Sequence, residues 1–444
     1  MSTSQKLLLC IHGFYGLATT MAALFLNLYL WKIAQDLNVN ALFILATFFF
    51  GTVAFIIGAI LSKRKDRIVS FQIGIGLTAF FYLVVIILQE KTAAIPMLIG
   101  ILNGLGAGFY WLGYLFLIYD LVDKKSRSFM GKQMAVFGIV NTVGPAFAGF
   151  IITRLSFTGY NIIFTLSLIL FFIGFLLSFR LPKDPSSKKT LHLRLLWRLN
   201  RRKPALKPMW GGWFLWGMCE GLLGFVPAVT LFMTVKNEFL VGISSILFGT
   251  VSILSSLWHS KYNHKEREPY TILTAWLIYF LSAVPMVINM NIWSVFIFLI
   301  VNEIGKALLG VSYFSFMFRL IGDLPKSGLR TESMVMREIY LNGGRILSVL
   351  TFILIYFLAK EFIHYYLLFA IFIQGMLFKI VMIDKKGLEL SKQTLSKRYS
   401  VNPYTKVLGN LELPRTFFCE DLNPGPSLLP GILAQNFMKY KNQL

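Results

Sequence analysis

Charged residues and cysteines are both scarce in this sequence. Only 14% of the 444 residues are Asp, Glu, Lys or Arg, whereas soluble globular domains carry about 25%. The three cysteines, Cys10, Cys219 and Cys419, include no CxxC pair and imply no disulfide framework. This composition excludes an ordinary soluble enzyme.

Sequence motifs for catalysis and for metal binding are also missing. No GxxxxGK[ST] loop occurs, so the chain cannot hydrolyse ATP by the P-loop route. The five histidines form neither an HExxH motif nor a metal-binding cluster, and no segment resembles a nucleophile elbow. We therefore predict a protein that is not an enzyme and that uses no metal and no cofactor.

Hydrophobic residues, in contrast, make up 56% of the chain, and 42 residues are Phe. A helix needs about 20 apolar residues to cross the hydrocarbon core of a bilayer. Twelve runs meet this requirement, at residues 7–31, 40–61, 68–88, 94–119, 132–153, 160–179, 209–235, 240–258, 270–290, 292–318, 337–359 and 363–383. Unpaired backbone groups are not tolerated in lipid, and no barrel-like alternation is visible. The predicted fold is therefore an all-α polytopic membrane protein with twelve transmembrane helices.

Nearly all of the positive charge falls in alternate connections between these spans. Lys and Arg cluster after the even-numbered spans, whereas the other connections hold only Lys32, Lys91, Arg154, Lys236 and Lys360. The positive-inside rule then predicts that both termini are cytoplasmic. The same distribution explains the net charge of +23 without a nucleic-acid partner, which would need these charges on one folded face.

A basic connection divides the chain into two sets of six spans. We predict an N-terminal six-helix bundle over residues 1–180, a basic cytoplasmic linker over 181–208 and a C-terminal six-helix bundle over 209–385. A polar, proline-containing tail over 386–444 is expected to be cytoplasmic and flexible. Within the linker, residues 191–199 are compatible with a short amphipathic surface helix or with a solvated coil.

The two halves also share a weak internal repeat. A shift of 199 residues places three residues of the fourth span on identical residues of the tenth, and pairs Asn103 with Asn302, Gly106 with Gly305, and Tyr114 with Tyr313. Parallel repeats of six spans place a binding site at their interface, near the bilayer midplane.

Two short motifs resemble those of the major facilitator superfamily. Gly58–Arg67 resembles its glycine- and charge-rich loop, with Ser62 and Lys65 in place of the usual aspartate and glycine. In the superfamily this loop locks the outward-facing state, which implies gating roles for Gly58, Lys63, Arg64, Asp66 and Arg67. In the fifth span, Gly144-Pro145 resembles the glycine–proline motif of antiporters, which implies a further gating element and favours export.

The resemblance covers residues 7–385 and is greatest to facilitators of Gram-positive, Bacillus-like bacteria. It implies a bacterial cytoplasmic-membrane protein that binds a small-molecule substrate in a central cavity. In this superfamily the first, fourth, seventh and tenth spans line that cavity, and one six-helix half rocks against the other. We expect the protein to be a monomer in the lipid bilayer.

The tenth span carries a polar strip. A charge inside a span costs about 2.5–3.5 kcal/mol on insertion scales, so each one is a candidate functional residue. Glu303 and Lys306 are three residues apart and share a helix face, and Asn302 and Tyr313 fall close to the same stripe. We predict that this strip lines the cavity and that Glu303 carries a proton. The alternative is an ion pair that only fixes helix packing.

Two further charges lie in the seventh and eleventh spans. Glu220 sits among glycines ahead of a proline that predicts a bend, and is either a second protonation site or the counterion of Lys306. Arg345 follows Arg337 and Glu338 at a spacing of about two helical turns. We predict a gating or interdomain ion pair there, with an arginine that snorkels to the membrane interface as the alternative.

Aromatic residues complete the candidate site. We predict that the opposite wall of the cavity consists of Asn103, Tyr110, Trp111 and Tyr114. The alternative is that these residues only pack against neighbouring helices. The start of the seventh span holds three tryptophans that are typical of a membrane-interface belt, Trp210, Trp213 and Trp216.

These features predict a proton-coupled secondary active transporter of a small organic, amphipathic solute, with efflux or flipping favoured over uptake. A membrane receptor or assembly partner that keeps this fold without transport is the second hypothesis.

Overall fold

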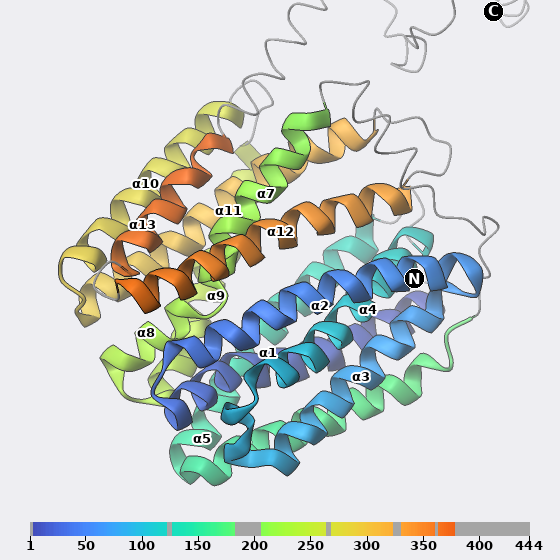
Figure 1. The fold of residues 1–444 in the computed structure, drawn as a ribbon. Coiled ribbons are helices and arrows are strands. Elements are labelled where there is room, and N and C mark those ends of the chain that lie inside the picture. The colour runs from blue at the N-terminus through green and yellow to red at the C-terminus, as the bar shows by residue number, and fades with distance from the viewer. Residues whose placement is uncertain are drawn as a thin grey trace, which may run out of the picture. The chain divides into compact units, whose positions relative to one another are not determined.

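The computed structural model of the protein describes residues 3–121, 127–182, 206–262, 268–322, 330–359 and 363–377. Within these residues every regular element is a helix (Figure 1). The helices are α1 (Thr3–Ala34), α2 (Leu37–Arg64), α3 (Arg67–Leu88), η1 (Gln89–Ala94), α4 (Pro96–Leu121), α5 (Arg127–Ser178), α7 (Leu206–Leu223), α8 (Val226–Val235), α9 (Glu238–Tyr262), α10 (Glu268–Ile288), α11 (Ile292–Gly322), α12 (Arg330–Leu358) and α13 (Ile363–Gln374). Most of the predicted linker and all of the predicted tail lie outside the described residues.

The lengths of these helices agree with the predicted spans. Ten stretches of the described chain are long and apolar enough to cross a bilayer. One of them, Ala135–Ser178, holds two predicted spans, which are divided at Ser156 by a left-handed φ of 51°. The described part of the last predicted span is the shorter helix α13. The predicted all-α polytopic fold is thus confirmed, and the described residues contain helix at each of the twelve predicted spans.

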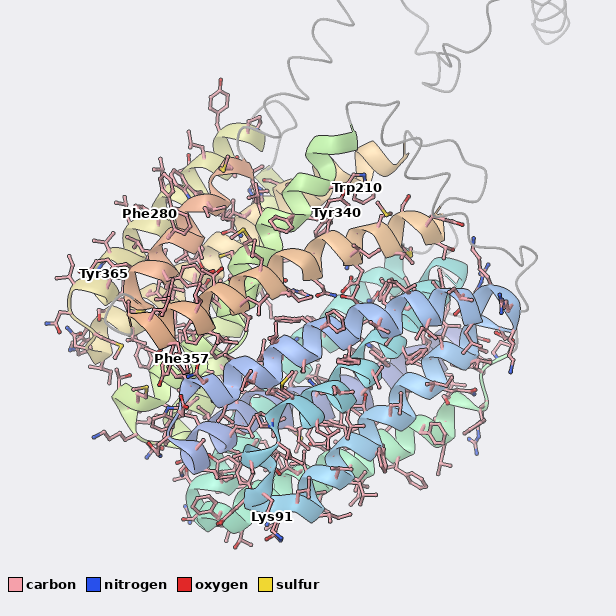
Figure 2. All side chains as sticks on the ribbon, viewed as in Figure 1. Lys91, Trp210, Phe280, Tyr340, Phe357 and Tyr365 are labelled. Atoms are coloured by element: carbon pink, nitrogen blue, oxygen red, sulfur yellow. The ribbon has the colours of Figure 1, made fainter. Side chains whose placement is uncertain are left out.

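The outer surface of the helices carries many large apolar side chains. Phe357 is 83% exposed and Tyr365 is 59% exposed, and both are labelled among the outward-pointing side chains in Figure 2. Soluble monomers rarely expose extended apolar surfaces. Lipid is therefore the medium in which this surface is stable.

The seventh span is broken where the sequence predicts a bend. α7 ends at Leu223, and α8 starts at Val226 with Pro227 in its first turn. A proline has no backbone N–H to donate to a preceding turn, so the helix cannot continue unbroken through this point. The Gly224 N–H donates to the carbonyl of Glu220 at 3.0 Å and closes the end of α7.

Helices α1–α5 pack together, and so do α7–α13, as the two groups in Figure 1. We call these groups the first and second halves. The halves meet chiefly where α5 packs on α9 and where α2 packs on α12. α1 ends near Lys32, and α2 runs back from there to Lys63, so these lysines lie at opposite ends of the helices. We call these the Lys32 end and the Lys63 end.

Small residues allow α5 to approach α9 closely. A Cβ on Gly242 of α9 would lie 2.5 Å from the carbonyl oxygen of Pro145 and 3.1 Å from the Cα of Gly149. On another face of α5, Gly144 packs against Thr20 of α1. The predicted gating residues Gly144 and Pro145 therefore lie at helix contacts, and Pro145 lies at a contact between the halves.

Gly242→Ala tests this close contact. Its methyl group would meet backbone atoms of α5, which cannot rotate away, so we expect the free energy of unfolding to fall by about 1–3 kcal/mol. Gly211→Ala in α7 is the matched control, because a Cβ at Gly211 has nothing within 4 Å. Helix propensity should leave that variant unchanged or more stable by up to about 1 kcal/mol. Equal melting temperatures of the two purified variants would contradict the packing argument.

Candidate functional site

A charged cluster lies between α7 and α12, near the middle of the seventh and eleventh spans. Arg345 donates to one carboxylate oxygen of Glu220 through Nε at 3.0 Å and Nη2 at 2.5 Å. The other oxygen of Glu220 accepts from the indole N–H of Trp216 at 2.6 Å. The side chains of Arg345 and Glu220 are 22% and 36% exposed, so protein does not fully enclose this ion pair.

The charged cluster continues along α12. Arg345 Nη1 donates to Asn342 Oδ1 at 2.7 Å, and Asn342 Nδ2 donates to Glu338 Oε1 at 3.0 Å. Arg337 and Glu338 form a further ion pair at 3.4 Å. Residues three, four and seven apart share a helix face, so Glu338, Asn342 and Arg345 form one hydrogen-bonded row.

The partners in this cluster differ from the predicted ones. The counterion of Glu220 is Arg345 rather than Lys306. Arg345 forms its ion pairs with Glu220 and Glu338 in its own half, and it contacts the other half through the ring of Phe48, 5.1 Å from the guanidinium carbon. Arg345 and Glu220 are 125 residues apart, and no local spacing indicates such a pair.

The predicted strip on α11 is present in part. Lys306 Nζ lies 2.9 Å from Glu303 Oε1, and the two side chains are 41% and 22% exposed. Asn302 is buried beside them, and its Nδ2 lies 3.4 Å from the same carboxylate oxygen of Glu303. Tyr313, in contrast, is fully buried, and its ring stacks on Trp216 with the centroids 5.8 Å apart. Tyr313 therefore belongs to a packed aromatic cluster and not to the exposed part of the strip.

The three tryptophans of α7 are also buried, so the predicted interface belt is wrong. Trp210, Trp213 and Trp216 are only 1%, 4% and 6% exposed. Trp210 stacks on Tyr340 of α12 with the ring centroids 5.8 Å apart (Figure 2). A spacing of three residues places the indoles on one face of α7, and this face packs against α11 and α12 instead of the headgroups.

The predicted wall on α4 lies mostly inside the first half. Tyr110 is fully buried, and its hydroxyl lies 2.7 Å from Nδ1 of His12 on α1. Tyr114 is 2% exposed and stacks on the same imidazole with the centroids 4.0 Å apart. Asn103 is half-buried and donates to a threonine of α2 at 3.3 Å. Trp111 is the exposed member of this group, at 42%.

The glycine- and charge-rich loop holds an ion pair between the halves. Lys63 Nζ, in the last turn of α2, lies 2.5 Å from Glu332 Oε1, in the first turn of α12. Both side chains are buried, with 7% and 0% exposure. Lys63 thus joins the two halves, and its gating role stays a prediction.

The other loop residues make contacts within the first half. Asp66 caps α3 by accepting from the N–H of Ile68 at 3.0 Å. The Arg67 guanidinium carbon lies 6.0 Å from the ring centre of Phe116. Arg64 is exposed, and Gly58 faces α3 and α4 so closely that a Cβ would meet their side chains.

Two acidic residues at the ends of the interface are not found by sequence reasoning. One is Glu332, and the other is Glu238, in the first turn of α9, which pairs with Lys32 at 2.6 Å. The partners are 269 and 206 residues apart. The sequence pattern that could indicate such pairs is a glutamate in the first turn of one span together with a lysine in the last turn of another.

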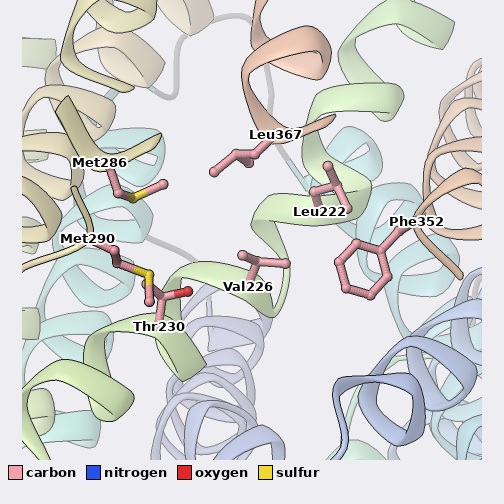
Figure 3. Close-up of a pocket in the computed structure, with 7 residues that line it drawn as sticks. All are labelled: Leu222, Val226, Thr230, Met286, Met290, Phe352 and Leu367. Atoms are coloured by element: carbon pink, nitrogen blue, oxygen red, sulfur yellow. The ribbon is translucent and has the colours of Figure 1, made fainter. Parts of the chain in front are cut away.

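A small apolar pocket lies farther along the seventh and eleventh spans than the charged cluster. Figure 3 shows its lining residues, Leu222, Val226, Thr230, Met286, Met290, Phe352 and Leu367. Six of the seven side chains are apolar, and the two methionines are flexible enough to adapt to different ligand shapes. In the described part of the chain, no three His, Cys, Asp or Glu side chains are grouped to hold a metal ion.

Comparisons with known proteins agree with this architecture. The family model described as Major Facilitator Superfamily matches residues 8–348. The protein YqgE of Bacillus subtilis (strain 168) is 31% identical over 357 residues, which cover 80% of this chain and 83% of YqgE.

A protein from the sodM 3′ region of Geobacillus stearothermophilus is 34% identical over 163 residues, which cover 36% of this chain and 75% of that protein. The human organic anion transporter MFSD10 has a similar fold, with a TM-score of 0.63 at 14% identity over 86% of this chain and all of MFSD10. The chain therefore belongs to the Major Facilitator Superfamily, a family of membrane transporters.

Proposed function

We propose that the protein is a proton-coupled secondary active transporter of a small amphipathic organic solute with an anionic or zwitterionic group. The observation that carries this proposal is that α7 and α12, which hold the charged cluster, each also contribute one residue to the lining of the apolar pocket. Leu222 follows Glu220 by two residues on α7, and Phe352 follows Arg345 by seven residues on α12. Seven residues of helix span about 10 Å, a length that suits a polar head joined to a short apolar chain.

The cations of the site are suited to an anionic head. Lys306 is 41% exposed, and its ammonium is held by the single carboxylate of Glu303. An arriving anion competes with Glu303 for Lys306, which leaves Glu303 able to bind a proton. Glu220 is held by two donors of Arg345 and by Trp216, so we assign proton coupling to Glu303 and substrate orientation to Arg345.

The structural relative MFSD10 carries the name organic anion transporter, which is in keeping with an anionic substrate here. At 14% identity it supports the fold alone, so the argument for an anion rests on Lys306 and Arg345. We further propose efflux or flipping across the bacterial plasma membrane by a monomer with both termini in the cytoplasm. The Lys63 end, which carries most of the basic loops, would face the cytoplasm.

The ion pair between Lys63 and Glu332 is the proposed gate at the Lys63 end. It joins α2 of the first half to α12 of the second, and both side chains are buried. Removal of one partner from a buried ion pair leaves the other charge with one contact fewer, at a cost in free energy to the form that contains the pair. That cost falls on the closed form of this end, since opening exposes the remaining charge to water.

Binding is tested by thermal melting of the purified protein against anionic, zwitterionic and neutral amphiphiles of graded chain length. A ligand at 100 times its dissociation constant stabilises a protein by about 2.7 kcal/mol. We expect stabilisation by charged amphiphiles that is lost in Lys306→Met and in Leu222→Trp. Lys91→Met, at an exposed lysine far from the site, is the matched control (Figure 2).

Flux in reconstituted vesicles tests the coupling. A proton gradient should drive the ligand identified by melting, and Glu303→Gln should retain binding but lose gradient-driven accumulation. Equal accumulation by Glu303→Gln and the unmodified protein would contradict the assignment of Glu303. Binding without flux in any variant would favour a receptor.

The two charged pairs of the site should differ in strength. Glu220 and Arg345 join two helices through two hydrogen bonds, whereas Glu303 and Lys306 lie on one helix. In double-mutant cycles with glutamine substitutions we expect coupling energies of about 1–3 kcal/mol for the first pair and 0.2–0.5 kcal/mol for the second. Reversible unfolding in mixed micelles measures both, and equal coupling energies would contradict the assigned roles.

Cysteine accessibility tests the gate. In a background without the three native cysteines, Ser62→Cys places a thiol at a position that is 1% exposed, next to Lys63. We expect Lys63→Ala and Glu332→Ala each to raise the rate of maleimide labelling by about tenfold, which corresponds to about 1.4 kcal/mol. The exchanged pair Lys63→Glu with Glu332→Lys should restore slow labelling. Slow labelling in both single variants would rule out this gate.

A further inference from the structure

At the Lys32 end, three aromatic rings and a carboxylate enclose the ammonium group of Lys32. Its Nζ lies 5.4 Å from the ring centre of Phe157, 5.6 Å from that of Tyr160 and 5.5 Å from that of Phe232. The same nitrogen lies 2.6 Å from Glu238 Oε1. All three rings are within the roughly 6 Å at which an aromatic face attracts a cation. We call these three rings and Glu238 the ammonium cage.

Both halves contribute to the ammonium cage. Phe157 and Tyr160 belong to α5, in the same half as Lys32, whereas Phe232 of α8 and Glu238 of α9 belong to the other half. The hydroxyl of Tyr160 also lies 3.4 Å from Glu238 Oε1, across the interface. When the halves separate at this end, an ion pair, a hydrogen bond and a cation–ring contact are lost together.

The charged pair of the cage is mostly shielded, although one of the three rings is exposed. The side chains of Lys32 and Glu238 are 24% and 11% exposed and Tyr160 is fully buried, whereas Phe157 is 46% exposed. Electrostatic attraction is stronger where water is excluded, and a cation gains more from aromatic rings when it is desolvated. The cage therefore binds an ammonium group more strongly than a surface ion pair would.

The two charges are also stable when they are apart. Lys32 lies in the last turn of α1, and Glu238 lies in the first turn of α9. A helix dipole favours a cation at its C-terminus and an anion at its N-terminus. Each charge thus keeps a favourable environment within its own half, which allows the contact to form and break repeatedly.

We propose that the Lys32 end is held closed by an ammonium-binding site that the chain fills with its own Lys32. The rings and the carboxylate define the ligand class as an organic ammonium ion. When the Lys32 side chain is removed, a small soluble ammonium ion occupies the cage and closes this end in its place. The inference depends neither on the transported solute nor on proton coupling, so it can fail or succeed independently of the proposed function.

The test measures the distance between the halves at the Lys32 end by double electron–electron resonance. Spin labels are attached to cysteines that replace Lys91 and Asn289, two exposed residues of the first and second halves at this end. The background is the full-length chain with its native cysteines replaced by serine. The unmodified lysine should give mainly the short, closed distance.

Lys32→Ala should lower the ratio of closed to open protein by about tenfold, equivalent to about 1.4 kcal/mol. Propylammonium, which supplies the missing charge and part of the missing stem, should restore the closed distance, whereas neutral propanol should not. Lys32→Met keeps the stem without the charge and should open this end in the same way, which covers the case of an alanine variant that does not fold.

Two control variants separate the cage from general effects. Lys63→Ala removes the lysine of the other inter-half pair and should leave the distance at the Lys32 end closed and insensitive to propylammonium. Adding Glu238→Gln to Lys32→Ala should abolish the rescue. The proposal is overturned if Lys32→Ala stays closed, if propylammonium fails to close it, or if propanol closes it equally well.

Discussion

A charge inside a bilayer has to be neutralised by a neighbour, and this constraint decides how the charged residues of this protein are arranged. Arg345 with Glu220 and Lys306 with Glu303 are paired within the second half. Lys63 with Glu332 and Lys32 with Glu238 are paired between the halves. The first kind of pair moves with its half as a unit, whereas the second kind has to break when the halves move apart. Paired charge thus contributes to the interface between the halves and, in the proposed function, also to ligand binding.

The two pairs between the halves follow one design at opposite ends of the molecule. In each, a lysine from the last turn of a first-half helix meets a glutamate from the first turn of a second-half helix. They differ in what surrounds the ammonium: Lys63 is buried with Glu332, while Lys32 lies among aromatic rings. Each end of the interface therefore has one lysine–glutamate contact that joins the halves.

Features that depend on local sequence were the predictable ones. The spans are predicted by the length of the apolar runs and by the cost of unpaired backbone groups in lipid. The break between α7 and α8 is predicted by a proline, which has no N–H to donate. The pair of Glu303 and Lys306 follows from a spacing of three residues on a helix. The burial of individual side chains was harder to predict from sequence. Tyr313 and the tryptophans of α7 are residue types that also occur in cavity walls and interface belts, but here they pack against neighbouring helices. Pairing between distant helices, as for Glu238 and Glu332, depends on which helices adjoin, and no spacing in the sequence encodes that.

The hydrogen bond from Trp216 to Glu220 has an optical consequence. The emission energy of an indole depends on the electric field across its ring, and here an ionised carboxylate lies at the N–H, with a guanidinium beyond it. Any event that moves Arg345 or changes the charge of Glu220 alters that field. The indole is buried with Tyr313 and is screened from the solvent that usually dominates fluorescence. The chain holds nine tryptophans, so a variant that keeps only Trp216 can follow the charged cluster by its fluorescence without any attached dye.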